Sequence, residues 1–107
     1  MGSTVLGGIF LGAKAIANMK NFFKSNDFAK NLASNSQKTT KIYQGQSIFK
    51  MTKKLGEIRK GDQYYLDGRE KNHLEVFDAQ GKSRGVYNLD GTKNLTKTEA
   101  AKGRTID

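Results

Sequence analysis

Three short stretches in the second half of the chain combine β-favouring residues with alternating polar and apolar positions, a pattern typical of strands with one buried face. They are Gln63–Leu66, His73–Phe77 and Gly85–Leu89. Successive side chains of a strand point to opposite faces, so Leu74 and Val76 share one face. His73, Glu75 and Phe77 share the other. We expect the apolar pair to cover a core and the His73–Glu75 pair to lie on the open face.

The segment before these strands also has β character. Alternation is visible at Ile42–Tyr43 and Ser47–Thr52, with Ile48 on one face and Phe49 and Met51 on the other. Turn residues separate the runs, because glycine, asparagine and aspartate supply the turns in a chain that has no proline. The pattern therefore predicts further strands upstream of the three described above.

The same pattern predicts a β-hairpin and a small hydrophobic core. Asp78–Lys82, with Gly81 as the residue of positive φ, is expected to join two strands, and Asp90–Gly91 is a second turn signal. A domain of this size is marginally stable by burial alone. The expected apolar contributors are Ile42, Ile48, Met51, Leu55, Ile58, Tyr65, Leu74, Val76, Val86 and Leu89.

The first part of the chain has a helical pattern instead. One helix stripe is formed by Ile9, Ala13, Ile16 and Phe23. The apolar run Val5–Ala13 is about half as long as a bilayer requires, so we do not expect stable membrane insertion. Two interpretations remain: a helix that packs on the domain, or an amphipathic segment for membrane contact or entry.

A second short helix is expected at Asp27–Ala33, where Ser25 or Asn26 can cap the first turn. The run Ser34–Thr40 is polar and without periodicity, and we interpret it as a linker. The tail, Lys93–Asp107, is basic and mixed in character.

These elements together predict an α+β fold, in which a small twisted antiparallel sheet of four to six strands is preceded by one or two N-terminal helices. We divide the chain into residues 1–40, an N-terminal helical segment with a linker, and residues 41–107, the sheet domain. Residues 1–40 are interpreted as a partner interface or an entry segment.

Composition narrows the possible partners. The formal net charge is +9, from 19 Lys and Arg against 10 Asp and Glu, which favours a polyanion such as RNA, DNA, an anionic membrane or an acidic protein. Without cysteine and with a single histidine, the chain offers neither a thiolate site nor a multi-histidine zinc site. No nucleotide-binding fingerprint is present, and we expect no cofactor and no metal.

The ionisable residues in and around the predicted strands suggest cleavage of RNA without a metal. In that reaction a base takes the 2′-OH proton, an acid protonates the 5′ leaving oxygen and a cation stabilises the charge on phosphorus. Glu75 is a candidate base and His73 a candidate acid, with Asp67 or Glu70 to orient them. Arg104 or Arg84 could supply the positive charge. A histidine and a glutamate two residues apart also occur by chance, as a surface histidine beside an ion pair.

Further basic residues are candidates for phosphate contacts, although the same residues could simply be solvated strand ends. The candidates for RNA binding are Lys53, Lys54, Lys71, Arg84 and Lys102. If they grip phosphates, binding should weaken steeply with added salt.

The stretch YYLDGREKNHLEVFDAQGKSRGVYNLDGTKNLTKTEAAKGRTI, residues 64–106, resembles the C-terminal ribonuclease domain of colicin E3-type bacteriocins and related polymorphic toxins, such as the tips of contact-dependent inhibition proteins. The shared sequence features are an aromatic strand that ends in Asp, a short loop, a strand with the pattern L-E-x-aromatic, a hairpin with Gly and a basic tail that ends in R-x-I. The resemblance implies a highly twisted antiparallel sheet and metal-independent endoribonuclease activity, on 16S ribosomal RNA or transfer RNA. It also implies an acidic immunity protein as partner.

Carried over by position, the family's catalytic Asp, Glu and Arg correspond to Asp67, Glu75 and Arg104. Its catalytic histidine corresponds to Glu70, while His73 stands three residues later. Either His73 takes the acid role, or Glu70 acts, or this copy is impaired; we favour His73 because it shares a strand face with Glu75.

The expectation from sequence is thus an antibacterial toxin domain, a hydrolase at residues 41–107 that is delivered from outside as part of a larger secreted or cell-surface toxin and acts in the target-cell cytoplasm. It would be a monomer or a toxin–immunity heterodimer. The alternative is a non-catalytic basic module that binds RNA or DNA.

Overall fold

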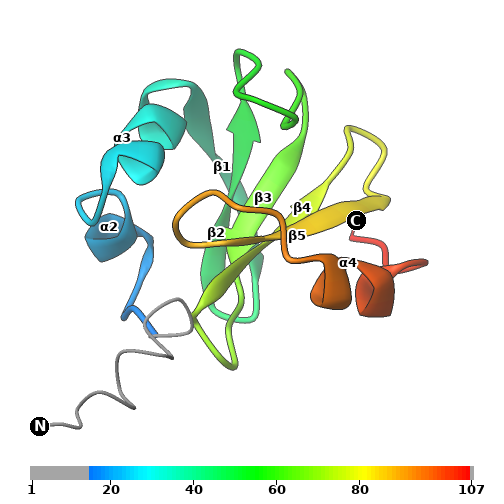
Figure 1. The fold of residues 1–107 in the computed structure, drawn as a ribbon. Helices are drawn as coiled ribbons and strands as arrows, with labels where there is room; N and C mark the ends of the chain where they lie inside the picture. Colours follow the sequence, from blue (N-terminus) through cyan, green and yellow to red (C-terminus); the bar gives the residue numbers. More distant parts are fainter. Residues whose placement is uncertain (1–14, 107) are drawn as a thin grey trace, which may run out of the picture.

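The computed structural model describes residues 15–106 of the chain. In this part, three helices accompany one five-stranded antiparallel sheet (Figure 1). The helices are α2 (Met19–Phe22), α3 (Asp27–Ser34) and α4 (Leu95–Ala101). The strands are β1 (Ser36–Tyr43), β2 (Gln46–Met51), β3 (Gln63–Leu66), β4 (His73–Phe77) and β5 (Ser83–Asn88).

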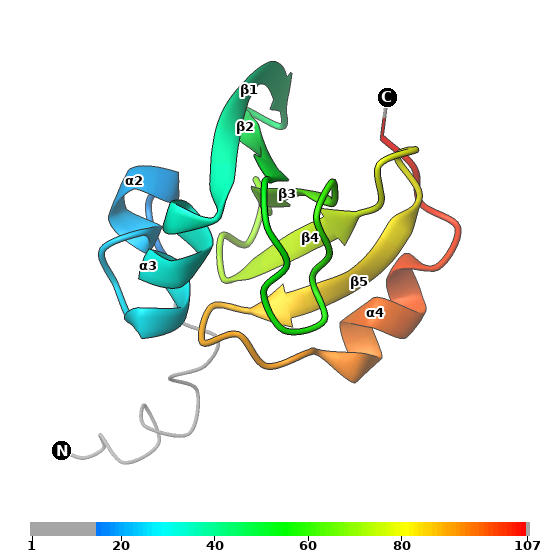
Figure 2. The ribbon, with the colours of Figure 1, turned by 90° about the horizontal axis from the view of Figure 1, so that it is seen from above.

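The strands follow one another across the sheet in chain order, β1-β2-β3-β4-β5, and every neighbouring pair is antiparallel. Each strand therefore pairs only with its neighbours along the chain. The strand direction turns strongly between β2 and β5, so the sheet is highly twisted (Figures 1 and 2).

Helices α2 and α3 pack against one face of the sheet (Figure 2). The apolar side chains of this core come from both helices, from β2 to β5 and from the loop between β2 and β3: Met19, Phe22, Ala29, Leu32, Met51, Ile58, Tyr64, Leu66, Leu74, Val76 and Tyr87. Leu74 and Val76 contribute as the strand alternation predicted. Burying this face against helices is what makes so small a sheet stable.

Helix α3 starts where the sequence predicts it. Asn26 is its N-cap, because its side-chain oxygen accepts a hydrogen bond from the Ala29 amide at 2.7 Å. The Asn26 side-chain nitrogen also donates to the Leu89 carbonyl at 2.9 Å. One capping residue therefore both begins the helix and fastens it to the chain after β5.

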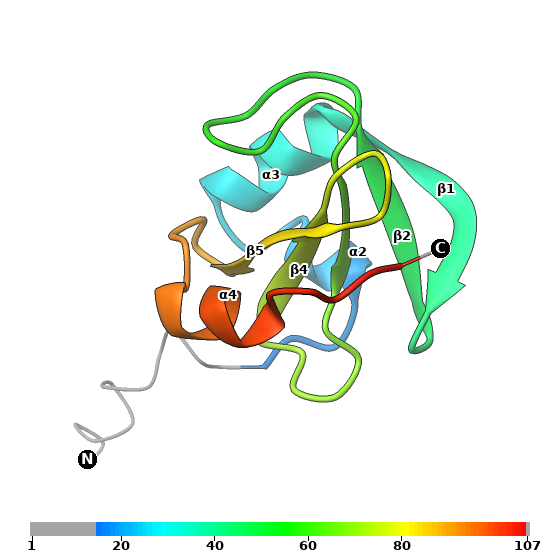
Figure 3. The same cartoon turned by 90° about the vertical axis from the view of Figure 1, so that its right-hand side faces the viewer.

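The opposite face of the sheet is covered by the chain after α4 (Figure 3). The Ser83 amide donates to the Arg104 carbonyl, and the Ile106 amide donates to the Gly81 carbonyl in the β4–β5 turn. Gly81 has φ +87°, and a side chain there would collide with the Ile106 carbonyl. Buried side chains on this face are Ile48, Tyr65, Phe77 and Ile106.

The α+β class and the antiparallel sheet agree with expectation. The second predicted strand, His73–Phe77, and the first, Gln63–Leu66, have the bounds of β4 and β3. The third was expected at Gly85–Leu89, but β5 begins at Ser83 and ends at Asn88.

The predicted linker at Ser34–Thr40 is wrong. Residues Ser36–Tyr43 form the long edge strand β1, so the division at residue 40 falls within a strand. Ile42, expected in the core, is 70% exposed. An edge strand that faces solvent needs no apolar alternation, which explains why its polar sequence looked like a linker.

The two ends of the described chain also differ from expectation. The predicted helix stripe included Ile16, but Ile16 precedes the first described helix, because α2 begins at Met19 with Asn18 as its extended N-cap. Ile9 and Ala13, also in the stripe, lie outside the described residues. Near the C-terminus, helix α4 lies within the tail, beside β5 (Figure 2). Among the residues described, no helix has the length and hydropathy needed to cross a bilayer.

Candidate active site

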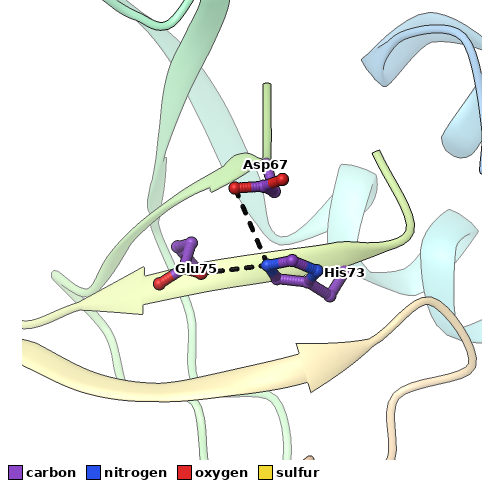
Figure 4. A group of neighbouring side chains, drawn as sticks. All are labelled: Asp67, His73 and Glu75. Atoms are coloured by element: carbon purple, nitrogen blue, oxygen red, sulfur yellow. Dashed lines mark hydrogen bonds and ion pairs between the residues drawn. The ribbon is translucent and has the colours of Figure 1, made fainter. Parts of the chain in front are cut away.

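The pairing of β3 with β4 brings three candidate catalytic residues together. Tyr65 lies opposite Glu75, and two positions further the Asp67 amide donates to the His73 carbonyl at 3.0 Å. Residues that face each other in an antiparallel pair project to the same side. Asp67, His73 and Glu75 therefore meet on the face opposite α2 and α3 (Figure 4).

His73 contacts an acceptor at each ring nitrogen. Its Nε2 lies 3.0 Å from Glu75 Oε2 and 3.7 Å from Asp67 Oδ1. On the other side, Nδ1 lies 2.8 Å from Asn72 Oδ1 and 3.6 Å from Glu70 Oε1. The imidazole is thus oriented by a side chain of β4 and by three side chains of the loop between β3 and β4.

The loop from Asp67 to His73 is ordered by Asp67 itself. Asp67 Oδ2 accepts hydrogen bonds from the amides of Arg69 at 3.1 Å and Glu70 at 2.6 Å. Its other oxygen faces His73. The loop is also held to the N-terminal segment, since the Ile16 amide donates to the Lys71 carbonyl at 2.7 Å. Asp67 is therefore both a turn residue and part of the site.

Glu70 lies at the rim of the site, with 54% of its side chain exposed. Its Oε1 accepts a hydrogen bond from Lys97 Nζ of α4 at 2.9 Å. This hydrogen bond, together with the positive charge of Lys97, holds the pKa of Glu70 below its ordinary value. Glu70 is thus a stabilised carboxylate, which fits an orienting role better than that of an acid.

Arg104 reaches Glu75 from the chain after α4. Arg104 Nη1 lies 3.4 Å from both carboxylate oxygens of Glu75. The expectation that His73 and Glu75 lie on an open face is wrong in one respect: they lie on the face without α2 and α3, but only 5% and 3% of their side chains is exposed. The anchored tail lies over this face, and the pair becomes the floor of a pocket.

A pocket of about 390 Å³ opens at this floor. Its lining residues are Asp67, Arg69, Glu70, His73, Glu75, Lys97, Ala100 and Arg104. Three cations therefore stand around three carboxylates and one histidine. Arg69 and Lys97 were missed by sequence reasoning; Arg69 could have been found from its place in the loop between Asp67 and His73, whereas Lys97 depends on how α4 packs.

The residues predicted to contact phosphates are not gathered in this pocket. Lys53 and Lys54 follow β2, and Lys54 lines a separate pocket with Arg84. Arg84 Nε lies 3.2 Å from Asp62 Oδ2, and Arg84 is not among the residues that line the pocket with His73 and Glu75. Lys102 pairs with Glu99 on the surface of α4. Lys71 lies in the loop between β3 and β4.

Metal binding is geometrically feasible at the floor. One ligand atom each from Asp67, His73 and Glu75 lies within 4.8 Å of the others. Carboxylate oxygens and an imidazole nitrogen are ligands that Zn²⁺ accepts, and a histidine ligand usually donates its second N–H to a nearby oxygen, as Nδ1 can to Asn72.

The fold and site define a class: a small α+β domain with a histidine–carboxylate cluster on one face of a meandering sheet. Comparison of the chain with models of protein families, with curated proteins and with solved structures found no match.

Proposed function

We propose that the protein is a metal-independent endoribonuclease in which Glu75 and His73 are the general base and the general acid. The observation that carries the proposal is the 3.0 Å contact between His73 Nε2 and Glu75 Oε2 at the floor of a pocket bordered by Arg69, Lys97 and Arg104. Acid–base catalysis needs two proton-transfer groups within reach of one substrate, and a phosphate substrate needs cations beside them.

In the proposed reaction Glu75 removes the proton from a ribose 2′-OH, and the 2′-oxygen attacks the adjacent phosphorus. The bond from phosphorus to the 5′-oxygen breaks, and His73 gives that oxygen its proton. The products are a 2′,3′-cyclic phosphate and a 5′-hydroxyl end. Arg104 neutralises charge on the phosphorane, while Asp67 and Glu70 hold the imidazole in place.

Burial of the pair supports a second candidate function, a basic module that binds nucleic acid without cutting it. A histidine and a glutamate that are 5% and 3% exposed and satisfied by each other could simply stabilise the sheet. Cleavage activity separates the two functions, since both predict binding.

The substrate class and the partner extend the proposal. We take ribosomal RNA or transfer RNA as the substrate and an acidic immunity protein as the neutralising partner, for a toxin that is delivered from outside and acts in the cytoplasm of the target cell. The net charge of +9 supports polyanionic and acidic partners of this kind.

The experiment that tests the proposal incubates purified protein with intact ribosomes and, separately, with total transfer RNA in EDTA, and maps the 3′ ends of the fragments. We expect a discrete cut with a cyclic phosphate end. Glu75→Gln should reduce the cleavage rate by about 10²- to 10⁴-fold and keep RNA affinity.

Glu99→Gln is the matched control, because it removes the same charge from an exposed side chain on α4 outside the pocket. Intact RNA in both incubations, with folded protein, would refute the nuclease and favour the binding module. Equal activity of the two glutamine variants would refute the role of Glu75.

A further inference from the structure

A second pocket, of about 300 Å³, adjoins the catalytic one and differs from it in character. It shares Asp67, Arg69 and Arg104 with the catalytic pocket. The residues that belong only to the second pocket are Tyr43, Gln44, Tyr65, Phe77 and Thr105. Aromatic rings thus lie beside two arginines that also border the candidate catalytic residues.

The aromatic side chains form a row that ends at the surface. Tyr65 and Phe77 are buried and stacked, with ring centroids 6.0 Å apart and planes 10° apart. Tyr43 packs on Tyr65 at 5.0 Å and 63°, and 41% of Tyr43 is exposed. An exposed tyrosine supported from below by buried rings is a rigid apolar platform.

The platform is fixed relative to the catalytic loop. Gln44, directly after Tyr43, accepts a hydrogen bond from the Gly68 amide at its Oε1, at 3.0 Å. Gly68 follows Asp67, and a side chain on Gly68 would collide with Gln44. The end of β1 is therefore docked on the loop that presents Asp67, and Tyr43 keeps a set position beside the catalytic pocket.

We propose that this second pocket binds an unpaired nucleotide next to the cleaved phosphate, with its base stacked on Tyr43. Arg69 and Arg104, which border both pockets, span the phosphates of the two neighbouring nucleotides. Aromatic stacking with backbone cations is the general mode of binding single-stranded nucleic acid. A base within a duplex has both faces covered, so the subsite selects single-stranded RNA.

This inference rests on the proposed ribonuclease function, but it can be tested without catalysis. The probe is a fluorescently labelled single-stranded hexanucleotide of 2′-O-methyl RNA, which has no free 2′-OH to act as nucleophile. Its binding to the full chain is measured by anisotropy at fixed salt. Tyr43→Ala should weaken binding by about 5- to 100-fold, whereas Tyr43→Phe should bind like the unchanged protein.

Ile42→Ala is the matched control, since Ile42 precedes Tyr43, is 70% exposed and does not line the pocket. A 2′-O-methyl duplex of equal length should bind Tyr43→Ala and the unchanged protein alike. Unchanged hexanucleotide affinity of folded Tyr43→Ala, or an equal loss for the duplex, would overturn the subsite. If Tyr43-dependent binding occurs but natural RNA stays intact, the subsite stands and the nuclease fails.

Discussion

At the scale of single residues, the ring of His73 is held by an oxygen atom at each of its two nitrogens. Nδ1 lies 2.8 Å from Asn72 Oδ1 and Nε2 lies 3.0 Å from Glu75 Oε2. A neutral imidazole donates from one nitrogen, whereas an imidazolium donates from both. Contacts on both sides fix the orientation of the ring, whichever nitrogen carries the proton, and a fixed ring is what a proton-transfer group needs.

Removal of Arg104 should cost stability as well as activity. Arg104→Ala removes the guanidinium beside the buried carboxylate of Glu75 and leaves only the His73 contact, so we expect the free energy of unfolding to fall by about 1 kcal/mol. In a Glu75→Gln background the same change should cost less, because no buried charge remains. Urea unfolding of the four proteins in this double-mutant cycle measures the difference.

Lys102→Ala is the control for that cycle, because Lys102 pairs on the surface with Glu99 and both side chains are at least 70% exposed. It should leave the unfolding midpoint nearly unchanged. An equal cost of Arg104→Ala in both backgrounds would show that Arg104 does not stabilise the Glu75 carboxylate.

Zinc should inhibit RNA cleavage reversibly. Tetrahedral Zn²⁺ holds ligand atoms about 3.3 Å apart, and His73 Nε2 is already 3.0 Å from Glu75 Oε2 and 3.7 Å from Asp67 Oδ1. Bound zinc would occupy His73 and Glu75, the proposed acid and base, together. We expect cleavage to fall as Zn²⁺ is added and to return with EDTA; zinc-dependent activation would contradict the metal-independent mechanism.

The sequence could reveal some of the site residues and not others. The shared face of His73 and Glu75 follows from strand parity, because successive side chains of a strand alternate between faces. That Asp67 faces them depends on the register in which β3 pairs with β4. The burial of the pair and the place of Lys97 could not be foreseen, since both depend on how the tail and α4 pack on the sheet. Such contacts join residues that are far apart in the chain.

At the scale of elements, strands β3, β4 and β5 were predictable, whereas the first half of the exposed edge strand β1 has the sequence pattern of a linker. β4 is buried at every position, and its successive side chains point alternately to the two covered faces of the sheet. β1 has exposed or half-buried residues throughout. Its pairing is fixed by backbone hydrogen bonds with β2 more than by side-chain burial, and backbone bonds leave little trace in the sequence.

Gly81→Ala should loosen the tail that carries Arg104. The substitution forces a strained positive φ and a collision with the Ile106 carbonyl, so the hydrogen bond that anchors Ile106 is lost. We expect a stability loss of about 2–3 kcal/mol and reduced RNA cleavage. Gly56→Ala is the control, since Gly56 also has positive φ but no atom near its missing side chain.

Measurements of urea midpoint and cleavage rate on the two alanine variants separate backbone strain from tail contact. Equal losses for both glycines would mean that contact with the tail contributes nothing at Gly81.

At the scale of the whole molecule, alkaline pH should unfold the protein through its tyrosines. Burial raises the pKa of Tyr64, Tyr65 and Tyr87, and the Glu75 charge adds to the effect at Tyr65. Above about pH 10 the unfolded chain loses phenol protons that the folded chain keeps, so stability falls as pH rises.

Chemical unfolding between about pH 9 and about pH 11 measures this loss. Tyr65→Phe should flatten the decline, because one raised pKa is removed while the ring remains. A variant whose stability declines as steeply as that of the unchanged protein would show that Tyr65 is not responsible.

The general plan of the molecule was accessible from sequence because helix caps, turns and strand alternation agree with one another. The opposed faces of Leu74 and Glu75 already imply that one face of the sheet is covered by an apolar layer. What covers each face was not accessible, because the short α2 and the tail helix α4 gain their stability from contacts with the sheet.

The chain-order arrangement of the strands has a kinetic consequence. Each strand can pair with the one made just before it, so most of the sheet forms by closing short loops, which favours rapid folding. Because the chain has no proline, refolding also lacks the slow isomerisation that delays many domains by tens of seconds or more. A stopped-flow refolding trace should therefore be complete without a proline-limited phase, and a protein with this topology can regain its structure quickly after being unfolded.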